Sequence, residues 1–276
     1  MLAKRRKYFW RLNMNSQHKN NDTAKLNKNP NRPKGQGIHV TVHDGIFNVG
    51  DPLDSNIEGF TQSSQAMGYP PINNDDIDYK KNVEMIYDKY ALEFSQNTKE
   101  YGEKYIQQEI TLFLSSLKGK KILDVGSGAG RDAIIFQKKG FSVVCIDLSK
   151  AMVALCKEKG LDAFEMDIEQ LNFQTGSFDG IWAYTSLLHF PKEKLPKILR
   201  KLKKILTKNG VFGIAMKEGN FEGYKKDKRY EEEMFISLYR AEDLRLILEK
   251  EFEIIYFSKT VVDQEHTYLN YICRIK

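Results

Sequence analysis

The chain has 276 residues, of which 41% are hydrophobic, and its formal net charge is +6. This length holds one large domain with an extension, and the apolar content is ample for a packed core, which excludes a wholly disordered or fibrous chain. Cys145, Cys156 and Cys273 form no CxxC pair and no zinc-ligand spacing, which favours a reducing compartment. No apolar stretch reaches the ~20 residues that a membrane span needs. We therefore expect a cytoplasmic protein with no membrane partner and no metal site.

Residues 1–78 differ in composition from the rest of the chain. Asn, Gly, Pro, Asp, Ser and Lys dominate, and neither a helical nor a strand period persists. Ten basic residues lie between Lys4 and Lys34, opposed only by Asp22. Such a segment can touch nucleic acid, but a solvated, disordered leader is the simpler interpretation. Residues 37–42 and 46–49 alone suggest short strands, which a tight turn would join as a hairpin.

From about Tyr79 the pattern becomes that of a folded domain. Val83, Ile86, Tyr87 and Tyr90 recur at helical spacing, and residues 105–117 form a second amphipathic helix. Short buried strands then alternate with helical stripes. The expected strands are 122–125, 142–146, 163–166, 178–183, 211–216, 252–258 and 267–275.

Alternation of strands and helices predicts a parallel sheet with helices on both faces. The last two strands have too few residues between them for a crossover helix, so they must pair antiparallel. Residues 79–276 are therefore predicted to form one α/β domain. It is a three-layer sandwich whose sheet has seven strands, mostly parallel, with an antiparallel last strand.

A glycine-rich turn and two further acids stand at the ends of the first three strands. The turn is Asp124-Val-Gly-Ser-Gly-Ala-Gly130, and Asp147 and Asp167 follow the next two strands. Ligands of open α/β sheets bind at these carboxyl ends. A dinucleotide dehydrogenase would have its last glycine where Arg131 stands, so a ligand without a pyrophosphate is favoured. Asp147 can accept hydrogen bonds from a ribose and Asp167 from an adenine amine, with helix N-capping as the structural alternative for each acid.

The sequence resembles the class I, Rossmann-like methyltransferases that depend on S-adenosylmethionine (SAM), of the general bacterial methyltransferase-domain type. The resemblance covers residues 79–276 and is carried by 122–132, 143–149, 166–168, 178–189 and 208–212. It implies SAM as the cofactor, with the glycines on the methionine part, Asp147 on the ribose, and Asp167 and Ile168 on the adenine. It also implies that Tyr87 covers the cofactor, although plain helix packing is the alternative. The expected cofactor-binding residues are Tyr87, Asp124, Gly126, Ser127, Gly128, Gly130, Arg131, Asp147, Leu148, Asp167, Ile168, Ala183 and Tyr184.

Methyl transfer from SAM needs alignment more than acid–base chemistry, and a base only where the acceptor is protonated. Tyr184, Thr185 and His189 follow the fourth strand, near the expected position of the methyl group. His189 is the best candidate for a base because its ordinary pKa is near neutral, with packing beside Phe190 as the alternative. Tyr184 is the second candidate catalytic residue. The polar segment after the fifth strand, 217–229, is expected to form a loop on the acceptor side.

The leading hypothesis is a SAM-dependent methyltransferase that modifies an O, N or S atom of a small molecule. An RNA methyltransferase that uses the basic leader is one alternative, and a SAM-binding module without catalysis is another. The [DN]PP[FYW] signature of amino-methyltransferases is absent after the fourth strand, where residues 183–186 read Ala-Tyr-Thr-Ser. The lysine-rich helix at 192–204 has an apolar stripe on its other side and is interpreted as a solvated face.

Overall fold

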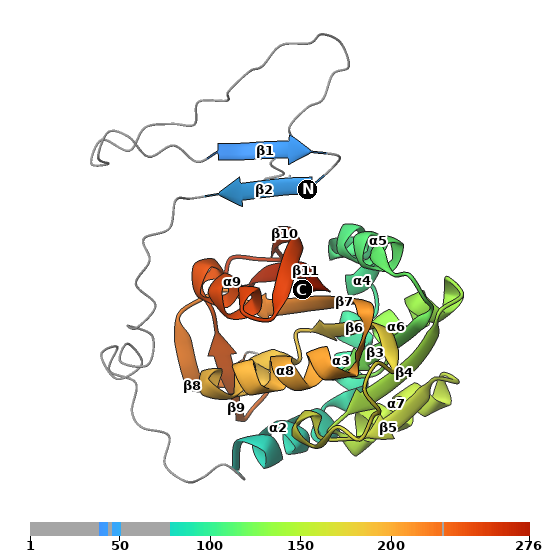
Figure 1. Ribbon diagram of the computed structural model, residues 1–276. Coiled ribbons are helices and arrows are strands. Elements are labelled where there is room, and N and C mark those ends of the chain that lie inside the picture. Colours follow the sequence, from blue (N-terminus) through green and yellow to red (C-terminus); the bar gives the residue numbers. More distant parts are fainter. Residues whose placement is uncertain (1–38, 44–45, 51–77, 228) are drawn as a thin grey trace, which may run out of the picture.

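The computed structural model describes residues 39–43, 46–50, 78–227 and 229–276 (Figure 1). From residue 78 onward the chain forms three layers, a sheet between two layers of helices. The seven strands of the sheet are β3 (Lys121–Val125), β4 (Ser142–Asp147), β5 (Asp162–Glu165), β6 (Phe178–Tyr184), β7 (Leu206–Lys217), β10 (Phe252–Val261) and β11 (Thr267–Ile275). Their order across the sheet is β10-β11-β7-β6-β3-β4-β5. The predicted seven-stranded α/β fold is confirmed, and each expected strand is present.

One strand of the seven is reversed. β11 pairs antiparallel with both β7 and β10. It is last in the chain, as predicted, but second from the edge of the sheet, because β10 and β11 form a hairpin whose second strand joins β7. This order places Asn270 of β11 opposite Ala215 of β7, where it accepts a hydrogen bond from the Tyr184 hydroxyl on β6.

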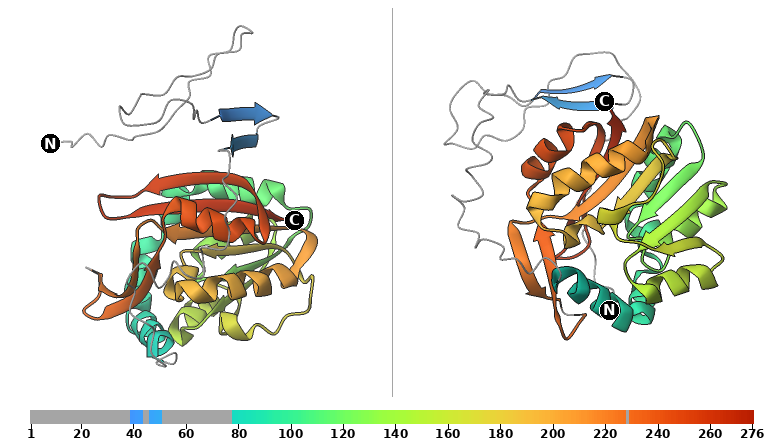
Figure 2. Two further views of the ribbon diagram at one scale, coloured as in Figure 1. Left: turned by 60° about the vertical axis from the view of Figure 1, so that its left-hand side comes forward. Right: turned by 60° about the horizontal axis from the view of Figure 1, so that its bottom comes forward.

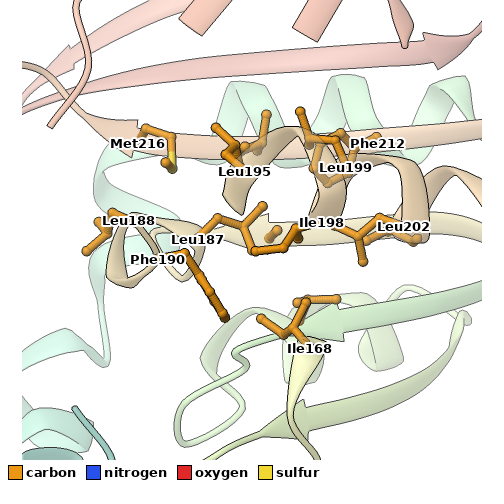
Figure 3. Close-up of a cluster of buried hydrophobic side chains, with 14 of the residues drawn as sticks. Ile168, Leu187, Leu188, Phe190, Leu195, Ile198, Leu199, Leu202, Phe212 and Met216 are labelled. Carbon is orange, nitrogen blue, oxygen red and sulfur yellow. The ribbon is translucent and has the colours of Figure 1, made fainter. Parts of the chain in front are cut away.

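Helices cover both faces of the sheet, as Figures 1 and 2 show. One face carries α5 (Gln107–Ser116), α6 (Arg131–Lys138) and α7 (Lys150–Glu158), and the other carries α8 (Leu195–Ile205) and α9 (Ala241–Glu249). In α8, the buried side chains of Leu195 and Leu199 face Phe212 of β7 (Figure 3). Burying a leucine contributes about 1.5–3 kcal/mol of transfer free energy, so the apolar stripe alone is enough to hold α8 on the sheet.

The N-terminal part of the domain is more broken than expected. Four short helices occupy the region where the sequence predicts two, namely α2 (Asp78–Lys89), α3 (Ala91–Thr98), α4 (Tyr101–Tyr105) and α5. The backbone at Ile106 leaves the helical region, with φ −130° and ψ 21°. Gly102 also packs so tightly that an added Cβ would lie 2.9 Å from Ile135 of α6. These breaks let the chain bend around the carboxyl edge of the sheet.

The loop predicted for residues 217–229 is wrong. Phe221–Lys226 and Glu233–Leu238 form an antiparallel hairpin, β8 and β9. Polar residues dominate β8 because most of its side chains are partly or fully exposed, whereas Met234, Phe235 and Leu238 of β9 are buried. The ring of Phe235 packs 5.2 Å from that of Tyr79 on α2. This segment lacks an alternating apolar pattern, and it forms a hairpin because β9 packs against α2.

A separate hairpin precedes the domain. β1 (His39–His43) and β2 (Ile46–Gly50) pair antiparallel, which confirms the two short strands expected there. The prediction that the rest of residues 1–78 form a disordered leader lies outside the described residues. Among the helices that the structure describes, none is long and apolar enough to cross a membrane.

Candidate functional site

A cavity of about 690 Å³ lies at the carboxyl ends of β3, β4 and β6, with α2 and α3 on its other side. This is the edge where open α/β sheets bind ligands. Twelve of the predicted site residues line it together: Tyr87, Asp124, Gly126, Ser127, Gly128, Arg131, Asp147, Leu148, Asp167, Ile168, Tyr184 and His189. No group of His, Cys, Asp or Glu side chains in the described part of the chain is arranged to hold a metal ion.

Two predicted cofactor residues are not among those that line the cavity. Gly130, at φ +76°, faces the core, where an added Cβ would lie 2.3 Å from Leu161. Ala183 is fully buried in the hydrophobic core. Gly126 is likewise required by packing, because a Cβ there would lie 2.3 Å from the Cβ of Ser186. A side chain at either glycine would therefore clash with the packing around the turn, although Gly126 also lines the cavity.

The glycine turn is held against the end of β4. The backbone N–H groups of Gly126 and Ser127 donate to the Ile146 carbonyl at 2.8 and 3.0 Å. Asp147 accepts from the Gly128 N–H at 2.8 Å through one carboxylate oxygen and from the Ser149 N–H at 2.9 Å through the other. Burial raises the pKa of Asp147, and the backbone hydrogen bonds oppose that shift. Each oxygen keeps a lone pair that a ribose hydroxyl can use.

Helix capping, the structural alternative for the two acids, applies to one of them. Ser149, not Asp147, caps α7, since its hydroxyl oxygen accepts from the Met152 N–H at 3.1 Å. Asp167 does cap the short 3₁₀ helix at Ile168–Gln170, accepting from the Glu169 N–H at 2.8 Å. Its other oxygen pairs with Lys80 at 2.6 Å.

Asp124 provides a direct check on the expected cofactor. Its side chain is 3% exposed, and its Oδ2 atom has no hydrogen-bond partner. Burial, and next the charge of Asp132, raise the pKa of Asp124 well above its usual range. A buried carboxylate without a partner is costly, and a cationic donor in the cavity would relieve that cost. SAM carries an ammonium group, which is such a donor, so the residues present fit it.

His189 and Tyr87 meet on the other side of the cavity. The Phe235 carbonyl, 2.9 Å from His189 Nδ1, can only accept, so Nδ1 carries the proton. His189 Nε2 therefore accepts from the Tyr87 hydroxyl at 3.0 Å. Burial lowers the pKa of His189 to about 4, which keeps the ring neutral at physiological pH. The two groups form one hydrogen-bonded pair in a single tautomeric arrangement.

Tyr184 is engaged in packing. Its ring stacks on Trp182 at 5.3 Å, and its hydroxyl donates to Asn270 at 2.8 Å. Arg131 lies near the Tyr184 ring and makes two hydrogen bonds of 2.7 Å to its neighbour Asp132. The hydroxyl that the sequence offers as a catalytic candidate is thus already used within the sheet.

Two residues of the site, Lys80 and Phe94, were missed in the sequence. Lys80 pairs with Asp167, Phe94 packs edge-on against Tyr87 at 5.3 Å, and both Lys80 and Phe94 line the cavity. Lys80, Tyr87 and Phe94 recur every seven residues, which is the signal that places them on one side of a helical segment. Thr185 also lines the cavity and has φ +60°, a strained value for a β-branched residue.

Comparison with known proteins agrees with this geometry. Residues 122–210 match the family model described as a methyltransferase domain. Over 151 residues the chain is 30% identical to a tRNA (carboxymethyluridine(34)-5-O)-methyltransferase of Xenopus tropicalis. The aligned region covers 53% of this chain and 22% of that protein. Over 127 residues it is 28% identical to a ubiquinone biosynthesis O-methyltransferase of Coxiella burnetii. This aligned region covers 44% of this chain and 51% of that protein. The chain thus spans about half or less of the length of these relatives.

The fold has relatives among solved structures. The crystal structure of magnesium protoporphyrin IX methyltransferase from Synechocystis PCC 6803, with bound S-adenosylhomocysteine, matches with a TM-score of 0.57 at 16% sequence identity. The match covers 72% of this chain and all of that one. The matched domain is that of a methyltransferase, and the fold is that of the Rossmann-like methyltransferases that use SAM.

Proposed function

We propose that the protein transfers the methyl group of SAM to an O, N or S atom of a small molecule. One observation carries the proposal: a single cavity is lined by the glycine turn, Asp124 and Asp147 on one side and by the Tyr87–His189 pair on the other. The groups proposed to bind the cofactor and those proposed to face the acceptor therefore share one cavity, as a direct transfer requires.

The cofactor would be held by residues of three strand ends. We assign Gly128 and Asp124 to the methionine part, Asp147 to the ribose hydroxyls, and Asp167 with the apolar side chain of Ile168 to the adenine. Leu148, Ser127 and Arg131 complete this wall of the cavity. Bound SAM supplies a methyl group that is already activated, so the protein has to bind, orient and exclude water.

Tyr87 and His189 would face the acceptor. The Tyr87 hydrogen points to His189, so the phenol oxygen has lone pairs left for a hydroxyl or amine of the acceptor. If that proton leaves, Tyr87 can take it while passing its own to Nε2 of the neutral His189 ring. The depressed pKa of His189 makes it a weak base, which suits an acceptor that is nucleophilic without strong general-base activation.

A small acceptor is favoured by the size of the space. A cavity of about 690 Å³ lies within the range of pockets for small molecules and cofactors, about 300–1,000 Å³. The ubiquinone biosynthesis enzyme among the relatives is named for a small-molecule pathway. An RNA acceptor is the second candidate, supported by the similarity to a tRNA methyltransferase and by the exposed basic residues of α8.

Cofactor binding tests the first half of the proposal. Asp147→Ala should weaken binding of S-adenosylhomocysteine, measured by calorimetry, by about 1–3 kcal/mol, because the ribose hydroxyls lose a charged acceptor. Asp162→Ala, at an exposed acid that begins the adjacent strand β5, is the matched control and should bind like the wild type. Equal affinities for the wild type and Asp147→Ala would remove Asp147 from the site.

Methyl transfer tests the second half. Cell extract is incubated with the protein and SAM labelled in its methyl group, and the label is counted in the small-molecule, RNA and protein fractions. Label in the small-molecule fraction is the expected result, and label in RNA would favour the second candidate. Tight SAM binding with no transfer in any fraction would instead favour a SAM-binding module without catalysis.

A further inference from the structure

Asp88, the residue after Tyr87, connects α2 to the cofactor side of the cavity. Its Oδ1 atom accepts hydrogen bonds from the Ser149 hydroxyl at 2.5 Å and from the Ala151 N–H at 3.0 Å. Ser149 is the N-cap of α7, and its own N–H donates to Asp147. One hydrogen-bonded chain thus runs from the glycine turn through Asp147 and Ser149 to α2.

Asp88 and Tyr87, which are adjacent on α2, contact opposite sides of the cavity. Asp88 bonds to the start of α7, and Tyr87 bonds to His189, which in turn bonds to the Phe235 carbonyl of β9. α2 is therefore the element that joins the side of the cavity formed by the glycine turn and Asp147 (the cofactor wall) to the side formed by His189 and β9 (the acceptor wall). A shift of α2 away from α7 would move the Tyr87 ring and break its bond to His189.

The stability of α2 itself does not explain an acid at this position. Asp88 is the second-last residue of α2, where a negative charge opposes the helix dipole. At the N-terminus of α7 the same charge is favourable, since unpaired N–H groups point toward it. No Lys or Arg side chain in the described part of the chain pairs with Asp88, so α7 supplies its main partners.

We infer that Asp88 is a positioning residue, which fixes α2 on α7 so that Tyr87 covers the cofactor and meets His189. The inference rests on the proposed function for the identity of the cofactor. Asp88 touches neither reacting atoms nor the transferred group. Its effect on the acceptor wall is exerted through Tyr87.

Four full-length variants test the role of Asp88. Asp88→Ala removes the acceptor, Asp88→Asn retains an acceptor oxygen, and Glu84→Ala removes an acid of α2 that lies one turn earlier as the matched control. Ser149→Gly deletes the hydroxyl donor from the other side, and glycine still serves as an N-cap at a cost of only a few tenths of a kcal/mol. It keeps the test valid if Asp88→Ala folds poorly.

Two readouts are taken from each variant. Calorimetry with S-adenosylhomocysteine should show about tenfold weaker binding for Asp88→Ala, since only the fraction with α2 in place is competent. NMR of the histidine rings, with His189 assigned from His189→Gln, should show its signal shifted, and its pKa moved up from about 4, in Asp88→Ala and Ser149→Gly. Asp88→Asn and Glu84→Ala should resemble the wild type in both readouts.

Two results would overturn the inference. One is an Asp88→Ala variant that matches the wild type in both affinity and His189 signal. The other is weaker binding with an unchanged His189 signal, because Asp88 would then act on the cofactor wall alone. If the wild type does not bind S-adenosylhomocysteine, the proposed function fails, whereas the His189 signal still decides whether Asp88 positions α2.

Discussion

At the scale of single residues, burial decides the chemical state of His189. The sequence offers a histidine with an ordinary pKa near neutral, which is why it was a candidate base. In the structure the Phe235 carbonyl and the Tyr87 hydroxyl use both ring nitrogens, and burial lowers the pKa to about 4. His189 is therefore a neutral hydrogen-bond acceptor, and the proton on Nδ1 is held by the backbone of β9.

This state predicts a dependence of stability on pH. Unfolded histidine has a pKa of about 6.5, so between pH 4 and 6.5 the unfolded chain binds more protons at His189 and stability rises with pH. The free energy of unfolding should fall by about 2 kcal/mol from pH 7 to pH 5 through this group. In His189→Gln that part of the pH dependence should disappear in urea denaturation curves.

His266→Gln is the control for this experiment. His266 lies on the turn between β10 and β11 and is not among the residues that line the cavity, so its replacement tests whether the effect is specific to the buried His189. The same slope in the wild type and His189→Gln would show that the ring is protonated freely in the folded state.

At the scale of elements, α2 and the hairpin β8–β9 act as one unit. The Asn82 amide donates to the Glu233 carbonyl at 2.9 Å, and its oxygen accepts from the Phe235 N–H at 3.3 Å. Asn82 thus binds the edge of β9 as a neighbouring strand would. Lys89, in the last turn of α2, pairs with Glu232 at 2.6 Å on the exposed side. Such exposed ion pairs contribute little to folding stability, so the hydrogen bonds of Asn82 are the more important contact between α2 and β9.

Asn82→Ala should therefore loosen the hairpin. Loss of two hydrogen bonds should lower the free energy of unfolding by about 1–2 kcal/mol, and the Phe235 amide should exchange its hydrogen faster. Hydrogen exchange followed by NMR measures both the local and the global effect. Lys81→Ala, at an exposed position of the same helix, should leave the Phe235 amide unchanged. Unaltered exchange at Phe235 in Asn82→Ala would mean that apolar packing alone holds the hairpin.

At the scale of the whole molecule, charge is unevenly distributed. Residues 192–208 contain eight basic residues and one acid, whereas the complete chain has a net charge of +6. Lys203 of α8 pairs with Glu251. Lys197, Arg200 and Lys204 are exposed on α8 and have no ion-pair partner among the described residues. This face is the feature of the domain that fits an RNA acceptor.

The RNA candidate predicts a salt effect. Replacing Lys197, Arg200 and Lys204 by Glu should weaken binding of a fluorescent single-stranded RNA and reduce the slope of log affinity against log salt by about 2, since fewer phosphates are neutralised. The control reverses three exposed lysines elsewhere, Lys139, Lys157 and Lys225. An equal loss of RNA affinity in both triple variants would mean that binding depends only on net charge. The exposed face of α8 would then not be an RNA-binding surface.

Local sequence is enough to predict the architecture and most of the residues that line the cavity at the carboxyl edge of the sheet. Strand–helix alternation, the glycine turn and the acids at strand ends depend on short segments, whose periodicity and turn chemistry are encoded locally. For this reason the sequence predicts the seven strands, the antiparallel last strand and the placing of Asp124, Asp147 and Asp167 at strand ends, and the structure brings these three acids to one cavity. The family resemblance then identified SAM as the ligand.

Only the tertiary structure decided the rest, because it depends on contacts between distant segments. The hairpin β8–β9 packs on α2, and Gly130 packs against Leu161 and is not among the residues that line the cavity. The tautomer of His189 follows from a carbonyl 46 residues away. The contact of Asp88 with the start of α7 spans 61 residues. No pattern within one segment reports such pairs, since their energies arise only when the chain has folded.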